Sequence, residues 1–348
     1  MKNKRLICWV VAIVLLLFSF GCNCSGDDLS QTSRPENTIP TTEQGELKTD
    51  GFSVHYLSVG QGDAIYIRFP DGKNFLIDAA VKSSENEDFI LSFLDAFGVQ
   101  TVDYMVLTHP DVDHIGNALS VIKNYDVGVI YLPFIHQTQM SLFPEYSEIK
   151  SYIDEHNIQN VLSDNYQFVK GDDYSVAFLS PNPKGNTGSS YDELMLEEVP
   201  SDLSINNLSP IIYVEYSGVR FIFTGDAGKS QESLVIKNYN SGFIDKVFSR
   251  HEITVELENV DFLKVGHHGA DNSTSNEFLE LLKPKYAVIS VGENYYGHPK
   301  SELLQRIYDN VPECNIKRTD VDGTVSVYVD DGKVSVITEM NNHSNRIG

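Results

Sequence analysis

Four strand-like segments of this chain are followed within two to seven residues by histidine or aspartate, and this pattern limits the folds that the chain can adopt. The apolar runs finish at Leu107, Thr224, Val265 and Val291. Side chains at the carboxyl ends of sheet strands line the edge where α/β proteins usually bind ligands. A single histidine or aspartate at a strand end can be explained by a cap or a turn. The same residue types at four strand ends predict that they form one site together.

Strand-like and helix-like segments alternate along the chain in two successive sets. Strands are expected from short runs rich in β-branched and aromatic residues, at 54–57, 64–69, 74–77, 102–107, 127–132, 174–179, 210–216, 219–224, 260–265 and 286–291, with a hairpin over 324–338. Helices are expected from helical spacing of apolar residues, at 85–97, 116–125, 147–156, 275–282 and 301–309. We therefore expect an α/β fold of the αββα sandwich type, with two mixed β-sheets packed face to face and helices on the outside.

The densest of the four strand ends is the hexapeptide His109-Pro-Asp-Val-Asp-His114. Its two imidazoles and two carboxylates compete for protons, and the carboxylates repel each other. A divalent cation relieves this conflict because it screens the carboxylates and takes the imidazole lone pairs. The alternative is a polar turn on a solvated loop, which Pro110 and the acidic residues could form by themselves.

The start of the chain resembles an export signal. Three basic residues precede an apolar run from Leu6 to Phe20, which is shorter than the roughly 20 residues of a spanning helix. The following Ser19-Phe20-Gly21-Cys22 resembles a bacterial lipobox, in which the cysteine is acylated. Three alternatives stay open: a lipoprotein lipidated at Cys22, an uncleaved anchor, and an ordinary cleaved signal. Each of them predicts an extracytoplasmic domain, and the first predicts a cell-membrane lipoprotein.

The expected domain organisation has three parts. Residues 1–21 form a lipoprotein signal peptide, residues 22–50 a flexible tether rich in Ser, Thr, Pro and acids, and residues 51–340 the folded domain. Residues 181–206 are rich in Pro, Gly, Ser and acids, and this composition predicts a long loop within that domain. Cys24 and Cys314 are far apart in the sequence, so neither a disulfide framework nor a thiolate zinc cluster is expected.

The chain is strongly acidic. Its 348 residues include 26 Lys and Arg against 49 Asp and Glu, which gives a formal net charge of -23. Loss of residues 1–21 removes three positive and no negative charges, so the remainder carries -26. This charge disfavours a broad basic surface for nucleic acid. It does not exclude a small metal site that acts on a phosphodiester, because bound cations dominate the local field.

In their order along the chain, the motifs resemble the metallo-β-lactamase-fold hydrolases, and in particular the extracytoplasmic hydrolase domain of the ComEC/Rec2 competence proteins. The resemblance covers residues 52–338. It rests on the motifs Val59-Gly-Gln-Gly-Asp-Ala64, Leu76-Ile-Asp78, Thr108-His-Pro-Asp-Val-Asp-His-Ile-Gly116, Asn206-Asn-Leu-Ser209, Thr224-Gly-Asp226, Leu263-Lys-Val-Gly-His-His-Gly269, Tyr296-Gly-His-Pro299 and Arg318-Thr-Asp320.

The resemblance implies a centre for one or two divalent ions, Mn²⁺ or Zn²⁺. Asp113 and His114 match the pair that binds one metal of the fold, and His267 matches the later histidine of the same site. Asp226 matches the carboxylate that bridges both metals and holds a hydroxide between them. We expect the Asp226→Ala and His267→Ala variants to lose metal-dependent hydrolysis.

The other metal site departs from the family pattern. His109 matches its first histidine, but Asp111 stands where the family usually has a second one. A further expected histidine is absent, and Asn207 and Ser209 occupy that stretch as supporting residues. Asp78 matches an acid that orients the metal loop from behind. Oxygen ligands in place of imidazole favour harder ions such as Mn²⁺ or Mg²⁺ and can weaken binding.

Three residues are candidates for catalytic roles in addition to metal binding. His268 and His298 could be ligands, proton donors or phosphate binders, and a supporting role is the alternative for both. Asp113 counts as a catalytic residue as well as a ligand. The turn from Gly60 to Asp63 is interpreted as structural.

The resemblance implies a surface-anchored metal-dependent hydrolase, a phosphodiesterase or nuclease of ComEC-like type that uses a metal-bound hydroxide. Its partners would be a phosphodiester substrate, DNA included, and the membrane through the lipid on Cys22; no protein partner is predictable. One alternative is a hydrolase of cell-envelope phosphodiesters of the teichoic-acid type. Another is a binding lipoprotein whose metal site has partly decayed.

Overall fold

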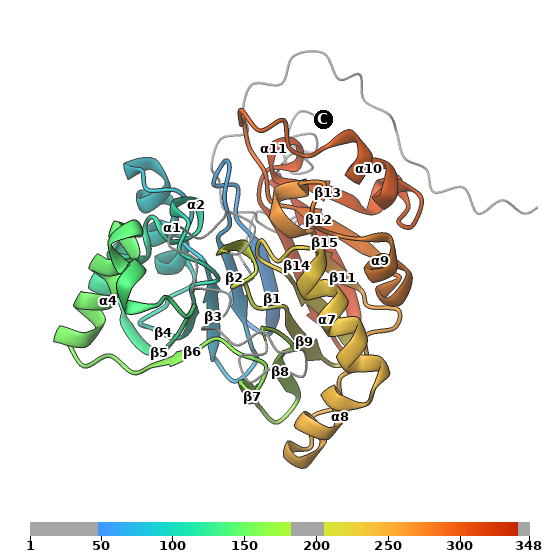
Figure 1. The fold of residues 1–348 in the computed structure, drawn as a ribbon, viewed down its shortest axis with the longest axis horizontal. Helices are drawn as coiled ribbons and strands as arrows, with labels where there is room; N and C mark the ends of the chain where they lie inside the picture. Colours follow the sequence, from blue (N-terminus) through green and yellow to red (C-terminus); the bar gives the residue numbers. More distant parts are fainter. Residues whose placement is uncertain (1–47, 182–204, 340–348) are drawn as a thin grey trace, which may run out of the picture. The chain divides into compact units, whose positions relative to one another are not determined.

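The fold is built on two mixed β-sheets that lie face to face (Figure 1). It is seen in a computed structural model that describes residues 48–181 and 205–339, all of which belong to the compact unit Gln31–Gly348. Helices cover the outer face of each sheet. The expected αββα sandwich is confirmed.

The first sheet has eight strands in the order β15-β14-β1-β2-β3-β4-β5-β6. Its strands are β1 (Phe52–Tyr56), β2 (Ile65–Arg68), β3 (Asn74–Ile77), β4 (Thr101–Val106), β5 (Asp126–Leu132), β6 (Asn160–Leu162), β14 (Val325–Asp330) and β15 (Lys333–Thr338). Pairing is antiparallel from β15 to β3 and parallel from β3 to β6. Because β3 and β4 run in the same direction, Asp78 and the hexapeptide emerge at the same edge.

The second sheet has seven strands in the order β13-β12-β11-β10-β9-β8-β7. Its strands are β7 (Phe168–Lys170), β8 (Tyr174–Phe178), β9 (Ile212–Tyr216), β10 (Val219–Phe223), β11 (Phe262–Lys264), β12 (Tyr286–Ile289) and β13 (Ile316–Arg318). Pairing is antiparallel from β7 to β10 and parallel from β10 to β13. The parallel strands therefore bring Asp226, His267, His268 and the loop after β12 to one edge.

Apolar side chains fill the space between the sheets and under the helices. Large aromatic residues of both sheets, among them Phe75, Phe178 and Phe221, are buried in the central cluster. The first sheet packs against α1 (Ser84–Ala96), α3 (Ala118–Asn124) and α4 (Pro144–Glu155). The second packs against α7 (Lys229–Asn240), α8 (Phe243–Phe248), α9 (Asn276–Leu282) and α10 (Ser301–Tyr308). Short helical segments are α2 (Val112–Ile115), η1 (Gln137–Leu142), η2 (Ser249–His251), η3 (Gly266–Gly269), η4 (Glu313–Asn315) and α11 (Thr319–Asp322).

Two α-helices longer than one turn, α7 and α8, and three strands were not expected from the sequence. Helix α7 was missed because part of its buried face is polar: Gln231, Glu232 and Asn238 are buried there. Helix α8 has only six residues, too few for helical spacing to be recognised. The Glu232 carboxylate accepts hydrogen bonds from the backbone amides of Thr274 and Ser275, so burial of this acid is compensated. Strands β6, β7 and β13 have three residues each, too few for an alternating pattern to be recognised.

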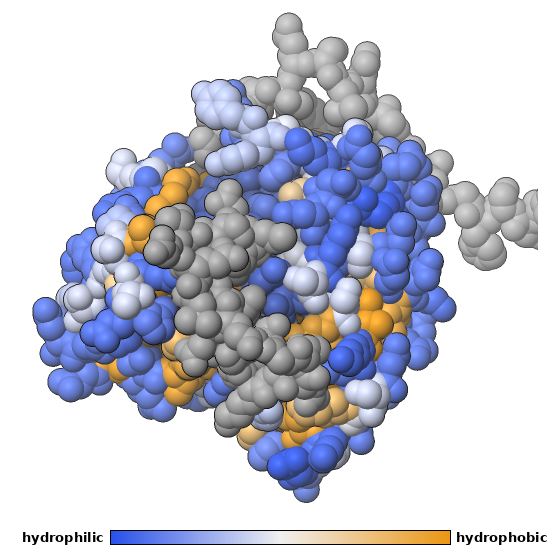
Figure 2. Space-filling view, in the orientation of Figure 1, coloured by the Kyte–Doolittle hydropathy of each residue, from blue (hydrophilic) through white to orange (hydrophobic). Residues whose placement is uncertain are grey.

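The expected signal peptide, Cys22, residues 22–47 of the tether and residues 182–204 of the long loop lie outside the described residues. Within residues 48–181 and 205–339, no helix has both the length and the apolar character that a membrane crossing needs. The face seen in Figure 2 is mostly hydrophilic with smaller hydrophobic areas, as expected for a chain with a net charge of -23.

Candidate metal centre

The hexapeptide forms the turn between β4 and α2. Both of its imidazoles are fully buried, whereas the side chains of Asp111 and Asp113 are 40% and 28% exposed. A Cβ atom at Gly62, whose φ is +135°, would lie 2.3 Å from the carbonyl oxygen of Asp113. Only glycine therefore fits this close approach, which lets the Asp63 amide donate to the same carbonyl at 3.2 Å. The turn at 60–63 supports the hexapeptide directly.

Two buried histidines are oriented so that their Nε2 atoms face each other. His114 Nδ1 donates to Asp78 Oδ2 at 2.7 Å, and Asp78 also accepts from the amide and hydroxyl of Thr108 at 2.8 and 2.7 Å. His268 Nδ1 donates to the carbonyl of Ser290 at 2.8 Å. The two Nε2 atoms lie 3.1 Å apart. Because both Nδ1 hydrogens are used, two lone pairs converge unless a proton or a metal cation lies between them.

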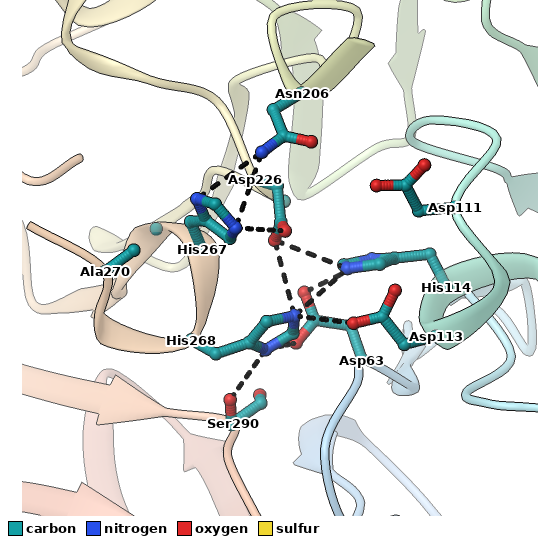
Figure 3. A network of polar contacts seen from close by, with 12 residues as sticks. Asp63, Asp111, Asp113, His114, Asn206, Asp226, His267, His268, Ala270 and Ser290 are labelled. Carbon is teal, nitrogen blue, oxygen red and sulfur yellow. Dashed lines mark hydrogen bonds and ion pairs between the residues drawn. The ribbon is translucent and has the colours of Figure 1, made fainter. Parts of the chain in front are cut away.

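Asp226 lies among His114, His267 and His268 (Figure 3), and His109 approaches it as well. Its Oδ1 is 3.3 Å from His114 Nε2 and 3.5 Å from His268 Nε2. Its Oδ2 is 3.8 Å from His109 Nε2 and 3.5 Å from His267 Nε2. Each oxygen of one buried carboxylate therefore faces two imidazoles, which is the arrangement needed to bridge two cations.

The centre can be divided by the oxygen of Asp226 that each part faces. The Oδ1 half consists of Asp113, His114 and His268, and the Oδ2 half consists of His109, Asp111 and His267. In the Oδ1 half, the potential ligand atoms of the three residues lie within 4.8 Å of one another. Asp113 Oδ2 is 3.5 Å from His268 Nε2, so this carboxylate faces the paired imidazoles.

The Oδ2 half is held by weaker or neutral contacts. His109 Nδ1 is 3.1 Å from the Thr108 hydroxyl and 3.2 Å from the Ser209 hydroxyl. Its Nε2 is 3.5 Å from Asp111 Oδ2. Ser209 also accepts a hydrogen bond from the Asp226 amide at 3.2 Å, so it supports the bridging residue as well as a ligand.

His267 lies at the more exposed side of the Oδ2 half. Its Nδ1 is 3.0 Å from Asn272 Oδ1, and the Asn206 amide nitrogen is 3.4 Å from both ring nitrogens. Asn206 therefore lies beside the candidate ligands. Its neighbour Asn207 instead accepts from the Gly228 amide at 3.2 Å and helps to begin α7. Asn207 therefore supports the segment that follows Asp226, and Asn206 lies next to His267.

The positions expected for the two adjacent histidines are corrected by the structure. His268, not His267, faces Asp113 and His114. Both residues have left-handed backbone angles, with φ of 49° for His267 and 51° for His268. This strained turn points the two consecutive side chains to different oxygens of Asp226. The sequence motif places both histidines at the site but does not reveal which one faces which oxygen.

Asp63 and Lys264 form a buried ion pair beneath the centre, which the sequence analysis did not assign. Lys264 Nζ is 2.5 Å from Asp63 Oδ2, and both side chains are no more than 1% exposed. Lys264 also donates to the carbonyl of Gly225 at 3.0 Å. Asp63 comes from the first sheet and Lys264 from the second, so the pair joins the sheets next to Asp226. The apolar run around Lys264 was the available signal, because a lysine inside a buried strand requires a partner.

The charges in the Oδ1 half depend on one another. Burial lowers the pKa of His114, but Asp226, Asp78 and Asp113 outweigh burial, and the pKa lies well above its ordinary value. Burial raises the pKa of Asp226, but His268 and His114 outweigh it, and the pKa lies well below its ordinary value. Asp226 thus stays ionised, and the carboxylates around His114 favour a positive charge at this place. Such a site is suited to a cation.

The residues present fit a divalent metal. Among the buried polar atoms that have no hydrogen-bond partner within the described residues, three belong to this cluster: His109 Nε2, Asp226 Oδ1 and Asp63 Oδ1. Buried polar atoms normally have partners, so orphaned atoms in a ligand-rich cluster point to an ion. The Oδ1 half offers two imidazoles and two carboxylates, a mixed set that suits Zn²⁺ or Mn²⁺. The Oδ2 half also mixes imidazole and carboxylate, but its Asp111 is more exposed.

His298 lies at the rim of the centre rather than between the ligands. Its ring is 5.5 Å from that of His267, measured between centroids, at an interplanar angle of 75°. Burial and the neighbouring imidazoles lower the pKa of His298 to about 4. The imidazole is therefore neutral near pH 7 and can donate or accept a hydrogen bond from a substrate.

Comparisons with known proteins agree with this geometry. The profile of the metallo-beta-lactamase superfamily matches residues 57–193. ComE operon protein 3 of Bacillus subtilis is 28% identical over 295 residues, which cover 80% of this chain and 33% of that protein. Recombination protein 2 of Haemophilus influenzae is 26% identical over 286 residues, 81% of this chain and 29% of that protein. The chain thus spans about a third of the length of these relatives.

Solved structures with this type of fold are more distant. The metallo-beta-lactamase fold protein YhfI from Bacillus subtilis is 10% identical and covers 82% of this chain and all of its own, with a TM-score of 0.44. A diphosphatase of the PhnP family is 12% identical and covers 80% of this chain and 98% of its own, with a TM-score of 0.41. From its own sheets, its motifs and the sequence matches, this chain has a metallo-β-lactamase-type fold and is similar to the ComEC/Rec2 competence proteins.

Proposed function

We propose that this chain is a surface-anchored, metal-dependent phosphodiesterase of ComEC-like type. The observation that carries the proposal is the position of Asp226, whose two oxygens each face two imidazoles. Paired metal sites that share a carboxylate are used to clamp a phosphoryl group during in-line displacement. The sequence similarity to competence proteins supports the class of protein but covers only about a third of their length.

The residues have distinct tasks in this proposal. One ion would be held by the Oδ1 half and a second by the Oδ2 half, with Asp226 shared between them. Divalent metal supplies a more acidic water and screens the charge of the phosphate. Asp78 and the carbonyl of Ser290 keep the Nδ1 hydrogens of the Oδ1 histidines occupied, so that both Nε2 atoms point inward. This fixes the ligands before a metal or a substrate arrives.

His298 would contact the substrate rather than a metal. Its Nδ1 is buried and has no hydrogen-bond partner within the described residues, and its ring lies beside that of His267. A neutral imidazole at this place can donate a hydrogen bond to a phosphate oxygen or to the leaving oxygen. We therefore assign His298 a role in substrate positioning at the open side of the centre.

Surface anchoring is the second part of the proposal and rests on the sequence. Basic residues, an apolar run and the segment Ser19-Phe20-Gly21-Cys22 support lipidation at Cys22. The lipid would hold the domain at the outer side of the membrane through residues 22–50. Metabolic labelling with a radioactive fatty acid tests this: label is expected on the native chain and absent from the Cys22→Ala variant.

A cell-envelope phosphodiester is the alternative substrate, and the acidic charge of -23 favours it over long nucleic acid. A binding lipoprotein with a partly decayed site is the other alternative, because Asp111 and the missing histidine weaken the Oδ2 half. The purified full-length chain in detergent should be assayed with Mn²⁺ and Zn²⁺ on bis-p-nitrophenyl phosphate, single-stranded DNA and p-nitrophenyl phosphorylcholine, with bound metal counted. Metal-dependent diester cleavage is expected; metal-free protein without turnover on any substrate would favour the binding lipoprotein.

A further inference from the structure

The loop between β12 and α10 carries two exposed tyrosines. Tyr295 is completely exposed, and Tyr296 is 69% exposed. A singly exposed aromatic ring is common on protein surfaces, but the Tyr296 ring stacks on that of His298 at the rim of the centre, which makes it a candidate for ligand contact. Tyr296 is the first residue of the motif Tyr296-Gly-His-Pro299, and neither metal binding nor the proposed reaction gives it a role.

Hydrogen bonds hold this loop in one conformation. The Asn294 amide nitrogen donates to the carbonyls of Gly292 and His298 at 2.8 and 2.9 Å, and the His298 amide donates to Asn294 Oδ1 at 3.0 Å. Lys300 Nζ donates to the Tyr296 carbonyl at 2.5 Å. The exposed ring is thus carried by an ordered loop, which reduces the conformational entropy lost when a ligand binds.

A series of rings connects Tyr296 with the metal ligands. The Tyr296 and His298 rings are stacked, with centroids 5.6 Å apart and an interplanar angle of 25°. His298 meets His267 edge to face at 5.5 Å, and His267 Nε2 is 3.5 Å from Asp226 Oδ2. The Tyr296 ring therefore lies two aromatic contacts away from a candidate ligand. A substrate whose phosphate lies at the metals can reach this ring with a neighbouring group.

The shape of the platform favours a flat ligand. Tyr296 stacks on one ring, that of His298, and no other ring contact of Tyr296 is seen within residues 48–181 and 205–339. Quaternary ammonium groups such as choline are usually enclosed by a cage of several rings. A single stacked pair with an exposed face instead suits a planar nucleobase, and every type of base can stack in this way.

We propose that Tyr296, stacked on His298, binds a nucleobase next to the scissile phosphate, and that the substrates are small nucleotide diesters rather than long nucleic acid. This inference rests on the proposed phosphodiesterase function. Stacking also fits the charge of the chain, because it gives affinity without a row of basic residues. Binding should accordingly change little with salt concentration compared with proteins that hold the phosphate backbone through lysine and arginine.

A fluorescent base tests stacking without any need for turnover. Full-length chain loaded with Mn²⁺ is titrated with a phosphorothioate-linked trinucleotide, thymine–2-aminopurine–thymine, because 2-aminopurine loses fluorescence when it stacks. Quenching is expected with the native chain and with Tyr296→Phe, which keeps the ring. Quenching should be lost in Tyr296→Ala and kept in Tyr308→Ala, where the altered tyrosine is 44% exposed on α10.

Kinetics test the same contact in the reaction. Thymidine 5′-p-nitrophenyl phosphate and methyl p-nitrophenyl phosphate share a leaving group and differ by the nucleoside. In Tyr296→Ala, the ratio of their kcat/KM values should fall about tenfold, the factor that corresponds to about 1.4 kcal/mol of stacking. Tyr308→Ala should leave the ratio unchanged.

The outcomes separate this inference from the function on which it rests. An unchanged ratio and unchanged quenching in Tyr296→Ala, with both esters still cleaved, would overturn the platform and leave the phosphodiesterase in place. Dependence of p-nitrophenyl phosphorylcholine cleavage on Tyr296, without quenching, would assign the platform to choline and also overturn the inference. Quenching without cleavage of either ester would support the platform while the proposed catalytic function fails.

Discussion

The two halves of the metal centre share Asp226 but differ in how their other residues are held. In the Oδ1 half, His114 and His268 are buried, and each Nδ1 donates to a carboxylate or a carbonyl oxygen at 2.7 or 2.8 Å. In the Oδ2 half, His109 and His267 contact hydroxyl and amide groups at 3.0 to 3.4 Å. A charged or strongly polar acceptor fixes an imidazole better than a hydroxyl that can rotate.

Because their ligands are held differently, the two halves should differ in their affinity for a metal ion. The Oδ1 half is rigid, carries an ion pair behind it and should bind the tighter metal. The Oδ2 half, with the exposed Asp111, should bind its metal more weakly and exchange it more readily. If both halves bind an ion, we expect the Oδ2 half to lose and acquire its ion more readily than the Oδ1 half.

Removal of the shared carboxylate should have the largest effect, because it damages both halves at once. In Asp226→Ala, we expect metal-dependent hydrolysis of bis-p-nitrophenyl phosphate to fall by more than about a hundredfold, beyond the loss usual for a residue that only orients a ligand. Metal content measured by mass spectrometry should fall for both ions. Asp245→Ala, an exposed acid on α8, serves as the control. Full turnover in Asp226→Ala would refute the bridged centre.

The ion pair behind the Oδ1 half should come next. Lys264→Met leaves Asp63 buried without its partner, and loss of one partner of a buried pair typically costs about 3–5 kcal/mol. We expect this decrease in the free energy of unfolding, measured by urea denaturation in EDTA. Asp63→Leu combined with Lys264→Met should recover most of the stability, since no charge is then left buried. A double variant no more stable than Lys264→Met would contradict the pairing.

The two neighbouring histidines allow a direct comparison of the halves. His268→Ala removes an imidazole from the Oδ1 half and should weaken the tighter metal site by about a hundredfold. His267→Ala should leave that site intact and reduce only the weaker one, by about tenfold. Competition titration with a chelating dye resolves the two sites. Equal loss of the tight site in both variants would remove the distinction between the halves.

The sequence predicted the architecture well because the strands that matter are long enough to show a pattern. The run before His109, the hairpin around Ser217 and Gly218, and the helix at 85–97 were all recognised. Helix α7 was missed because buried Glu232 makes part of its core face resemble a solvated one. Tertiary hydrogen bonds from another segment compensate this acid, and no local pattern reveals them.

The sequence predicted which residues lie at the candidate site better than it predicted how they are oriented. His109, Asp113, His114, Asp226 and both adjacent histidines lie together, as expected from three of the four strand ends, and His298 from the fourth lies at the rim. The assignment of His267 and His268 to the metals depended on two left-handed backbone angles, which sequence patterns do not reveal. Asp63 was interpreted as part of a structural turn, yet it is buried and paired across the sheets with Lys264.

The smallest expected effect comes from restoring an imidazole to the Oδ2 half. Asp111 Oδ2 is 3.5 Å from His109 Nε2, so the side chain at 111 lies within reach of the same ion. Asp111→His replaces a hard oxygen ligand with a borderline nitrogen one, and should raise the affinity of the weaker site for Zn²⁺ over Mn²⁺ by about tenfold.

Asp111→Asn provides the matched control, because it removes the charge without adding an imidazole and should weaken both ions. Titration of each ion against a competing dye gives the ratio. If Asp111→His leaves the preference unchanged, Asp111 does not contact the metal, and the Oδ2 half is then reduced to His109, His267 and one oxygen of Asp226. Such a set has too few fixed ligands for a resident ion, so the weaker metal would have to arrive with the phosphate of the substrate.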